Sequence, residues 1–372
     1  MTLNEIDESL KFRVIKNEPL KWYSALEEPF SLHGVFYSEK DSCYRRLGSE
    51  IANNEELGEG IPYLSRCTSG GRLRFKTNSP YVALRCAVPN IDIIATMSLV
   101  SSMGFSMYVD GVFMGNFTPI WANILNPVDG ELKVEGWYWE EERNTISFEG
   151  ILKTKLEKEG EIDIYFPLYG GVKDLYIGVA PDCSLEKPRD YSRKDKVLFY
   201  GSSITQGGYA SHPGNDYPSL VCKWLDVDYV NLGFSGSCVC EPPLIKYMAS
   251  LNPDVFVFDY DHNAPTVEFL QNTHLTAYRT FRSICKTAHI IFITKPDFDY
   301  ADFAKERREI IYSTYKTALR EGDNLVSFIN GEDLYGTEER QLCTVDMIHP
   351  NDMGLYRMAK TVKPVLEKCL KK

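Results

Sequence analysis

The chain of 372 residues has no apolar run of about 20 residues, the length a helix needs to cross a bilayer. It also has no excess of basic side chains, because 41 Lys and Arg stand against 52 Asp and Glu, a net charge of −11. A nucleic-acid-binding protein needs a basic surface, and an anionic membrane surface repels an acidic chain. The sequence therefore predicts a protein that binds neither nucleic acid nor membrane.

The ten cysteines include no Cys-x-x-Cys pair. Zinc sites need such paired ligand spacing, so no metal site is predicted. Ten cysteines in 372 residues are also far fewer than a disulfide scaffold contains, and several lie in apolar runs, such as Cys222 in SLVCKWL. The segment MTLNEIDESLKF lacks the basic and apolar regions of a signal peptide. We therefore expect reduced thiols and a cytoplasmic location, an expectation that a leader removed from the chain would change.

The composition is that of a globular protein, and its length predicts about two domains at roughly 150 residues each. Residues 1–190 consist of short β-branched and aromatic runs separated by Gly, Pro, Asn and Asp. RLRFKTNSPYVALRCAV predicts two strands around a turn, and Asp110-Gly111 lies between alternating apolar runs, which is typical of a hairpin. This half is predicted to be a β-sandwich of the jelly-roll kind.

Residues 191–372 follow a different pattern, in which strands alternate with helices. Buried strands are predicted at KVLFYG, DYVNLGF, DVFVFDY, HIIFIT and LVSFING. Helices are predicted from near Asp216, from the prolines of PPLIKYMAS, and over about 267–285, 302–320 and 352–370. Strands that alternate with helices form a parallel sheet covered on both faces. The polar, proline-containing stretch 181–195 places the domain boundary near residue 190.

Polar residues follow several of these strands, where the ligands of open α/β sheets collect. Ser203 follows the first strand in GSSITQGG, Gly236 follows the second, and Asn263 follows the third. Asp346 and His349 follow the fifth strand, after a loop. A serine, glycine backbone, an amide and an Asp/His pair are the components of acyl transfer. A nucleotide site is the weaker interpretation, because GSSITQGG lacks the Lys of a P-loop and the third glycine of GxGxxG.

In their order and spacing these blocks resemble those of the SGNH (GDSL-type) hydrolases. Ser203 in GSSITQG matches the first block, Gly236 in NLGFSGS the second, Asn263 the third, and Asp346 and His349 in DMIHPND the last. The resemblance implies a flavodoxin-like, three-layer α/β/α catalytic domain with about five parallel strands. It is greatest to the two-domain subset with a β-sandwich in front and a GSSIT-type nucleophile turn.

The chain departs from the family pattern at two places and matches the subset at one more. Ser202 stands where the family usually has Asp. The third block reads Asp261-His262-Asn263-Ala264 instead of Gly-x-Asn-Asp. The segment Gly171-Val172-Lys173-Asp174-Leu175-Tyr176 resembles a signature of the subset's front domain.

The resemblance implies a serine esterase without a cofactor. His349 would be the base for the nucleophile Ser203, and Asp346 would orient His349. The N–H groups of Ser203 and Gly236, with the amide of Asn263, would form the oxyanion hole. We expect hydrolysis of small O-acyl esters, most plausibly acetyl esters of a small molecule or an oligosaccharide.

Several alternatives stay open at this point. The same residues would serve an acyltransferase, and the sandwich alone would serve a non-catalytic carbohydrate-binding protein. Asp346 and His349 could merely cap the last helix, and His262 could be a base, a substrate contact or a structural residue. No role is assigned to His33 or His212, and the oligomeric state is left open, a homo-oligomer included.

Overall fold

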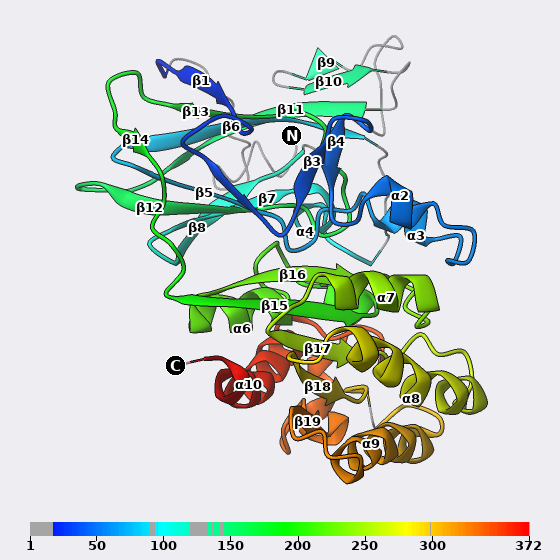
Figure 1. Ribbon diagram of the computed structural model, residues 1–372. Helices are drawn as coiled ribbons and strands as arrows, with labels where there is room; N and C mark the ends of the chain where they lie inside the picture. The colour runs from blue at the N-terminus through cyan, green and yellow to red at the C-terminus, as the bar shows by residue number, and fades with distance from the viewer. Residues whose placement is uncertain are drawn as a thin grey trace.

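The computed structural model describes residues 18–89, 94, 96–119, 133–134, 137–140, 145–297 and 299–371. Figure 1 shows an amino-terminal part of antiparallel strands standing on a carboxy-terminal part in which helices flank a parallel sheet. Among the described residues, no helix combines the length and the apolar character that a membrane crossing requires.

Two antiparallel sheets form the amino-terminal part. The first contains, in spatial order, β1 (Lys21–Ser24), β13 (Leu175–Val179), β6 (Tyr81–Pro89), β11 (Thr145–Lys153), β10 (Trp137–Glu140) and β9 (Lys133–Val134). The second contains β14 (Leu185–Glu186), β5 (Arg72–Thr77), β12 (Gly160–Tyr165), β7 (Phe105–Val109) and β8 (Val112–Phe117), with β2 (Ser31–His33) also paired to β5. Short elements complete this part: β3 (Phe36–Ser38), β4 (Cys43–Arg45), α2 (Ser49–Ala52), α3 (Ile61–Leu64) and α4 (Leu99–Met103).

One buried core joins the two sheets, which makes this part a β-sandwich. Phe75 of β5 and Phe105 of β7 pack in the same cluster as Leu84 of β6 and Ile177 of β13. The predicted hairpin is present, since β7 pairs with β8 across Asp110-Gly111 and both turn residues have positive φ. The predicted strands β5 and β6 are also present, but they belong to different sheets. The jelly-roll topology stays a prediction.

The carboxy-terminal part is built on a five-stranded sheet. Its strands are β15 (Arg193–Gly201), β16 (Val227–Gly233), β17 (Val255–Asp259), β18 (His289–Ile293) and β19 (Val326–Ile329). Their spatial order is β16-β15-β17-β18-β19, and every neighbouring pair is parallel. This is the flavodoxin-like order, so the predicted fold class is confirmed.

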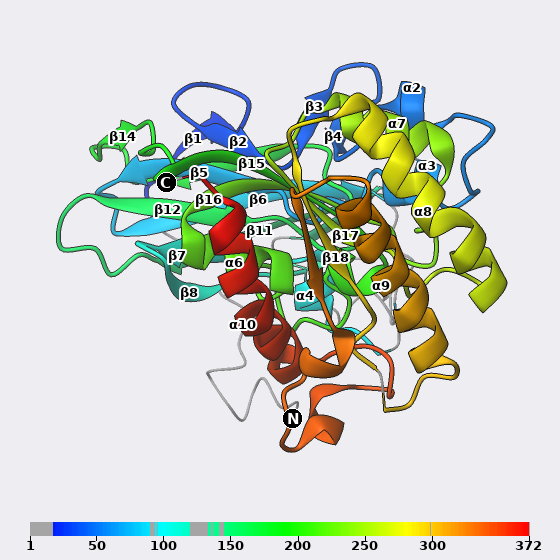
Figure 2. The ribbon, with the colours of Figure 1, turned by 60° about the horizontal axis from the view of Figure 1, so that its bottom comes forward.

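Helices cover both faces of this sheet, as Figure 2 shows. One face carries α6 (Tyr217–Leu225) and α10 (Asp352–Cys369), and the other carries α7 (Pro242–Ser250), α8 (Val267–Ile284) and α9 (Ala304–Arg320). The short elements of this part are α5 (Ser203–Gln206), η3 (Gly331–Asp333) and η4 (Arg340–Cys343).

The sequence of β17 explains the three layers. Side chains of a strand alternate between faces, so Val255 and Val257 pack toward α6 and α10, whereas Phe256 and Phe258 pack toward α7, α8 and α9. Both faces of β17 are fully buried. A strand buried on both faces needs a continuous apolar run, which VFVF provides.

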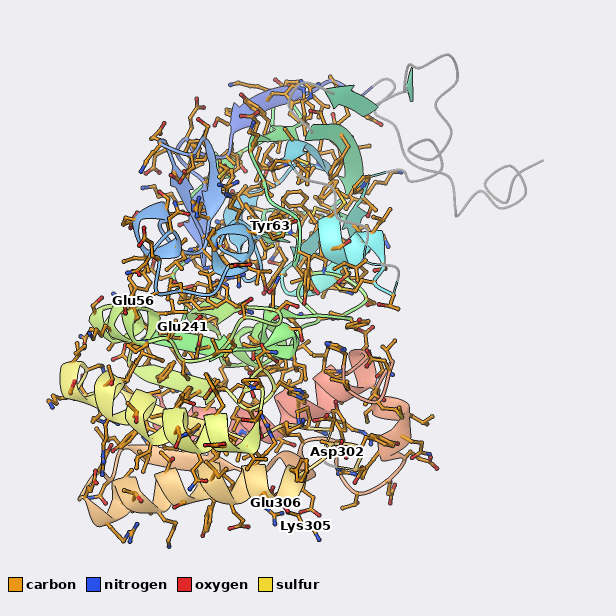
Figure 3. The ribbon with its side chains drawn as sticks, turned by 90° about the vertical axis from the view of Figure 1, so that its right-hand side faces the viewer. Glu56, Tyr63, Glu241, Asp302, Lys305 and Glu306 are labelled. Carbon is orange, nitrogen blue, oxygen red and sulfur yellow. The ribbon has the colours of Figure 1, made fainter. Side chains whose placement is uncertain are left out.

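Part of the amino-terminal half packs on the α/β part. Ala52 of α2, Leu47 just before it, and Ile61 and Leu64 of α3 lie in the same buried cluster as the α7 face of the sheet. The N–H of Gly58 donates to Glu241 Oε1 at 3.1 Å. Figure 3 shows Glu241 and Glu56 on the two sides of this border. The boundary near residue 190 stays a prediction, but apolar contacts clearly cross between the two halves.

A fully buried arginine, Arg46, connects the two halves by hydrogen bonds. Its guanidinium donates to the carbonyl oxygens of Leu64 and Cys67 at 2.7 Å on the sandwich side. It also donates to the carbonyls of Asn231 and Gly233, at the end of β16, at 3.0 and 2.8 Å. Burial lowers the pKa of Arg46 to about 10, so the side chain stays protonated at neutral pH.

A second connection joins Arg72 and His33 of the sandwich to Asp228 of β16. Arg72 donates to Asp228 Oδ1 and, at 3.1 Å, to the carbonyl of Tyr229, while His33 Nδ1 lies 3.1 Å from Asp228 Oδ2. Burial alone would raise the pKa of Asp228, but the bond to His33 and the charge of Arg72 hold it at about 2.

We expect Arg46→Met to destabilise the protein by about 3 kcal/mol, because it leaves several buried carbonyl oxygens without a donor. Chemical denaturation would measure the free energy of unfolding. The control is Arg85→Met, which breaks a half-exposed ion pair with Glu149 and should cost about 1 kcal/mol or less. Equal losses in the two variants would contradict a central role for Arg46.

Because of the Asp228 contacts, we expect the free energy of unfolding to fall as the solution becomes more acidic. Because the folded pKa of about 2 lies below the ordinary value of 3.8, the stabilisation is complete above pH 4 and is lost as the pH falls toward 2. The carboxylate is partly exposed, so the effect is about 1 kcal/mol. Asp228→Asn should remove this part of the acid dependence in denaturation curves between pH 4 and pH 2. The exposed Asp182→Asn should leave it in place, and identical curves for the two variants would refute the assignment.

Candidate active site

The five predicted site residues lie on loops at the carboxyl edge of the parallel sheet. Ser203 is the first residue of α5, directly after β15. Gly236 follows β16, and Asn263 follows β17. Asp346 and His349 lie on the loop that precedes α10. Four separate loops therefore converge at one edge, as the strand order requires.

A continuous chain of hydrogen bonds joins Ser203, His349 and Asp346. Ser203 Oγ lies 3.0 Å from His349 Nε2, and His349 Nδ1 lies 2.8 Å from Asp346 Oδ2. An ionised carboxylate can only accept, so it selects the His349 tautomer that carries a proton on Nδ1. Nε2 is then free to accept the Ser203 proton. Such an arrangement can activate a serine hydroxyl as a nucleophile.

Backbone hydrogen bonds shape the loop that carries His349 and Asp346. Thr344 and Pro350 form an antiparallel bridge, and the N–H of Val345 donates to the carbonyl of His349 at 2.9 Å. The helix that follows is capped by Asn351, whose side chain accepts from two N–H groups of α10. Asp346 and His349 are therefore not the cap of the last helix, and that alternative is wrong.

The environment of Asp346 keeps its carboxylate ionised. Burial would raise its pKa, but the N–H groups of His349 and Ile348, at 2.7 and 3.1 Å, together with the His349 ring, lower it below the ordinary value. A charged Asp346 can stabilise the imidazolium that forms when His349 takes a proton.

The turn that presents Ser203 is fixed at both ends of α5. Ser202 Oγ accepts from the N–H of Ile204 at 3.2 Å, so Ser202 performs the capping that the family's usual Asp would perform. At the other end, Gln206 donates to the carbonyl of Leu168 at 3.2 Å and accepts from the N–H of Ser235 at 2.9 Å. Gln206 thus ties the nucleophile turn to the sandwich and to the Gly236 loop.

Close backbone approach holds the end of β16 against α5. A Cβ on Gly233 would lie 2.2 Å from the backbone nitrogen of Gln206. Asn231 locks this contact, because its side chain donates to the carbonyl of Thr205 at 2.7 Å and accepts from the N–H of Gly233 at 2.8 Å. Only glycine fits at position 233.

Gly236 and Asn263 belong to neighbouring loops that are bonded to each other. Gly236 has a φ of +67°, a left-handed conformation that favours glycine, and no atom lies within 4 Å of the position a Cβ would take. Asn263 Oδ1 accepts from the N–H of Cys238 at 3.2 Å. The Asn263 amide is thereby oriented by the Gly236 loop, and its Nδ2 group remains as the donor.

Two tyrosines that no sequence pattern points to also belong to this region. The ring of Tyr209 stacks on His349, with centroids 4.5 Å apart, and its hydroxyl accepts from Thr96 of the sandwich at 2.9 Å. A Cβ placed on Gly208 would lie 3.0 Å from the hydroxyl of Tyr169, also from the sandwich. The N–H of Gly208 itself donates to the carbonyl oxygen of Ser203 at 2.8 Å. Sandwich residues therefore reach the nucleophile turn.

The remaining histidines lie outside the Ser203 hydrogen-bond chain. His262 Nε2 lies 3.1 Å from Asp297, whose pKa burial would raise but the His262 charge lowers. His212 stacks on Phe113 at 4.3 Å, and His33 is the partner of Asp228.

The loop of His262 is fixed by an ion pair of Asp261 with Arg307 at 2.8 Å, both side chains being buried. Within the described residues, no group of three or more His, Cys, Asp or Glu side chains is arranged to hold a metal ion.

Two family models match the chain. Residues 194–367 match the GDSL-like lipase/acylhydrolase family, and residues 20–185 match the N-terminus of SGNH-hydrolase-type esterases. The chain belongs to the SGNH (GDSL-type) hydrolases and to their two-domain subset. It is a carboxylic-ester hydrolase by family.

Solved structures show the same architecture over nearly the whole chain. A GDSL-lipase-like protein from Bacteroides ovatus ATCC 8483 is 25% identical, with 95% of this chain and 99% of that one covered and a TM-score of 0.79. A salicylyl-acyltransferase from a tetracycline biosynthetic pathway is 16% identical, with 95% and 98% covered and a TM-score of 0.72. A family two carbohydrate esterase from Clostridium thermocellum is 12% identical, with 92% and 98% covered and a TM-score of 0.61. At these identities, the acyltransferase and the carbohydrate esterase show only that their fold is that of this chain. The search of curated proteins found no match.

We expect Gly233→Ala to destabilise the protein by about 3 kcal/mol, because the added methyl group meets backbone atoms that cannot move independently. Gly236→Ala, three residues away, meets no atom and should cost only about 1 kcal/mol for its left-handed backbone. Thermal and urea denaturation of the two variants would compare them. A smaller loss for Gly233→Ala would show that the contact with Gln206 is not rigid.

Proposed function

We propose that the protein is a serine esterase that removes small O-acyl groups, above all acetyl groups, from carbohydrates. The observation that carries the proposal is the hydrogen-bonded chain of Ser203, His349 and Asp346 at the carboxyl edge of an SGNH-type domain. A binding protein without a reaction to perform has no need of this chain.

In the proposed acylation step, Ser203 Oγ attacks the ester carbonyl carbon while His349 Nε2 takes the hydroxyl proton. The tetrahedral intermediate collapses, the bond to the alkoxy oxygen breaks, and His349 delivers the proton to the leaving alcohol. The acyl group remains on Ser203. Asp346 stabilises the imidazolium during both transfers.

In the second step water takes the place of the alcohol. His349 accepts a proton from water as the hydroxide adds to the acyl-enzyme, and it then returns that proton to Ser203 as the carboxylic acid leaves. The N–H groups of Ser203 and Gly236, with the Asn263 amide, would bind the oxyanion in both steps. One such donor is worth about 3 kcal/mol of transition-state stabilisation.

A carbohydrate substrate is supported by the two-domain architecture, which the chain shares with a family two carbohydrate esterase. The cytoplasmic location stays a prediction, and the ten free thiols agree with a reducing compartment.

The runner-up is an acyltransferase that uses the same residues, since an acyltransferase shares this fold. The acyl-enzyme is common to both reactions, and only the acceptor differs. Mass spectrometry after incubation with acyl donors and candidate acceptor hydroxyls separates the two: free acid identifies a hydrolase, and a new ester identifies a transferase.

We expect Ser203→Ala to lower kcat for p-nitrophenyl acetate by at least about 10⁴-fold, because it removes the nucleophile. Circular dichroism should show an unchanged fold, since Ser203 contributes one hydroxyl to a loop. The matched control is Ser283→Ala on the exposed surface of α8, which should keep full activity.

A fluorophosphonate probe should label the wild-type protein and the Ser283→Ala variant but not Ser203→Ala. Retained hydrolysis by Ser203→Ala would overturn the proposal. A wild-type protein that neither hydrolyses esters nor reacts with the probe would favour a non-catalytic carbohydrate-binding protein.

A further inference from the structure

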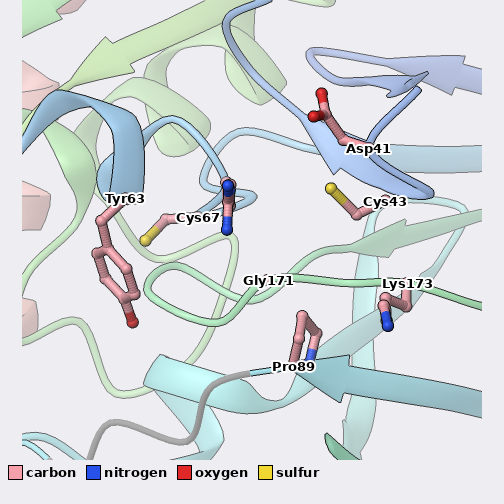
Figure 4. A pocket seen from close by; sticks show the side chains of 8 residues that line it. Asp41, Cys43, Tyr63, Cys67, Pro89, Gly171 and Lys173 are labelled. Atoms are coloured by element: carbon pink, nitrogen blue, oxygen red, sulfur yellow. The ribbon is translucent and has the colours of Figure 1, made fainter. Parts of the chain in front are cut away.

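The sandwich contains a pocket of about 130 Å³ beside the segment 171–176. Figure 4 shows Tyr63 and Cys67 on one side of the Gly171 loop, and Cys43, Asp41 and Lys173 on the other. Its lining consists of Asp41, Cys43, Tyr63, Arg66, Cys67, Pro89, Gly171 and Lys173. We call it the Arg66–Lys173 pocket. Its volume is below the roughly 300–1,000 Å³ of sites for whole drug-sized ligands, so it suits one functional group of a larger molecule.

The segment 171–176, which matches the front-domain signature, has two sets of side chains. Val172 and Leu175 are buried in the sandwich core. The N–H of Lys173 donates to the carbonyl of Ala87 at 2.8 Å and fixes the backbone. Gly171 and Lys173 line the pocket instead. Core packing therefore explains Val172 and Leu175 but not Gly171 and Lys173.

The pocket carries more positive than negative charge, because its lining holds Arg66 and Lys173 but only one acid, Asp41, whose pKa is lowered by its hydrogen bond from Ser38 and further by the charge of Arg66. In the described part of the chain, Arg66 and Lys173 form no ion pair and no side-chain hydrogen bond. The one acid in the lining, Asp41, is already bound by Ser38 Oγ at 2.8 Å and by Arg45, which is buried, at 3.1 Å. Two cations thus remain on a protein of net charge −11.

The other lining groups do not cancel this charge. Burial raises the pKa of the Cys43 thiol, so it is neutral at neutral pH. Gly171 keeps the pocket open, because a Cβ there would lie 3.2 Å from Pro89 and 3.4 Å from the carbonyl of Arg66. The pocket therefore combines space for an anionic group with two cations that have no ion pair or side-chain hydrogen bond among the described residues.

Both walls of the pocket continue to the active site. Tyr63 belongs to α3, which begins after Gly60, and a Cβ on Gly60 would lie 2.4 Å from Ser237 Oγ, next to Gly236. On the other wall, Gly171 lies two residues after Tyr169, whose hydroxyl reaches the turn of Ser203. The two segments that line the pocket thus also contact the Gly236 loop and the turn of Ser203.

We propose that the Arg66–Lys173 pocket binds the carboxylate of an acidic sugar, which makes the substrate an esterified uronic-acid carbohydrate. The inference rests on the proposed function and deepens it. An arginine fork matches the two oxygens of a carboxylate, and a lysine adds a second point charge. Phosphate and sulfate groups share this chemistry, so the experiment distinguishes them.

The first test measures binding by isothermal titration calorimetry with methyl glucuronoside, methyl glucoside and glucose 6-phosphate. We expect the glucuronoside to bind at least tenfold more tightly than the other two. The double variant Arg66→Ala/Lys173→Ala should remove this preference, because each charge-assisted hydrogen bond contributes strongly to affinity. Equal affinities of the wild-type protein for the uronate and the neutral sugar overturn the inference, as does preferential binding of the phosphate.

The matched control is Lys153→Ala. Lys153 is an exposed lysine of β11 that pairs with Tyr81 at one end of β6, whereas Pro89 of the pocket lies at the other end. The two ends of β6 are about 26 Å apart at ~3.3 Å per residue. This variant should keep the preference for the uronate. Lys173→Arg, which retains the charge, should keep most of it. A preference lost in Lys153→Ala as well would show a general charge effect and overturn the inference, and circular dichroism would confirm that each variant is folded.

The second test compares kcat/KM for acetylated methyl glucuronoside and acetylated methyl glucoside. We expect the wild-type protein to favour the acidic ester at least tenfold, and the double variant to bring the ratio close to one. Equal rates for the two esters overturn the pocket inference but leave the esterase proposal intact. Failure of the esterase proposal looks different, because the wild-type protein would then hydrolyse neither ester nor p-nitrophenyl acetate.

Discussion

The arrangement of the two halves depends on the buried guanidinium of Arg46. Within the described ranges it has no acidic partner, and backbone carbonyl oxygens from both halves accept its hydrogen bonds instead. Backbone carbonyls cannot rotate toward a donor as side chains can, so the planar fork of Arg46 accepts only one placement of the sandwich on β16. The end of β16 leads directly into the Gly236 loop. One buried cation thus sets the position of the sandwich relative to a loop of the active site.

Contacts with backbone groups also hold the turn that presents Ser203. Gly233 lets β16 approach α5 closely, and the side chains of Asn231 and Gln206 bond the facing backbone groups. The end of β16 and the turn of Ser203 are therefore bonded directly to each other. A rigid support of this kind holds Ser203 within hydrogen-bonding distance of His349, although the two residues come from opposite ends of the α/β part.

The two halves contribute different parts of the proposed reaction. The α/β part supplies Ser203, His349 and Asp346, as expected for an edge at which parallel strands end. The sandwich supplies Tyr169, the Arg66–Lys173 pocket, and Thr96, which donates to the hydroxyl of Tyr209. In the proposed reaction, chemistry and substrate recognition are therefore divided between the halves, and the contacts of Arg46 and Asp228 hold the two halves together.

The sequence by itself determined the local elements and the order of the chemical groups. Alternation in β17, the cap at Asp216 and the turn at Asp110-Gly111 are encoded by neighbouring residues, so strands and helices were predictable, as were the residues at the strand ends. Only the tertiary structure decided that β5 and β6 lie in different sheets, and that Arg46 and Tyr169 reach the loops beside Ser203. Arg46 is separated from Gly233 by 187 positions. Contacts at such separations follow from the packing of whole sheets, for which a single sequence carries no periodic signal.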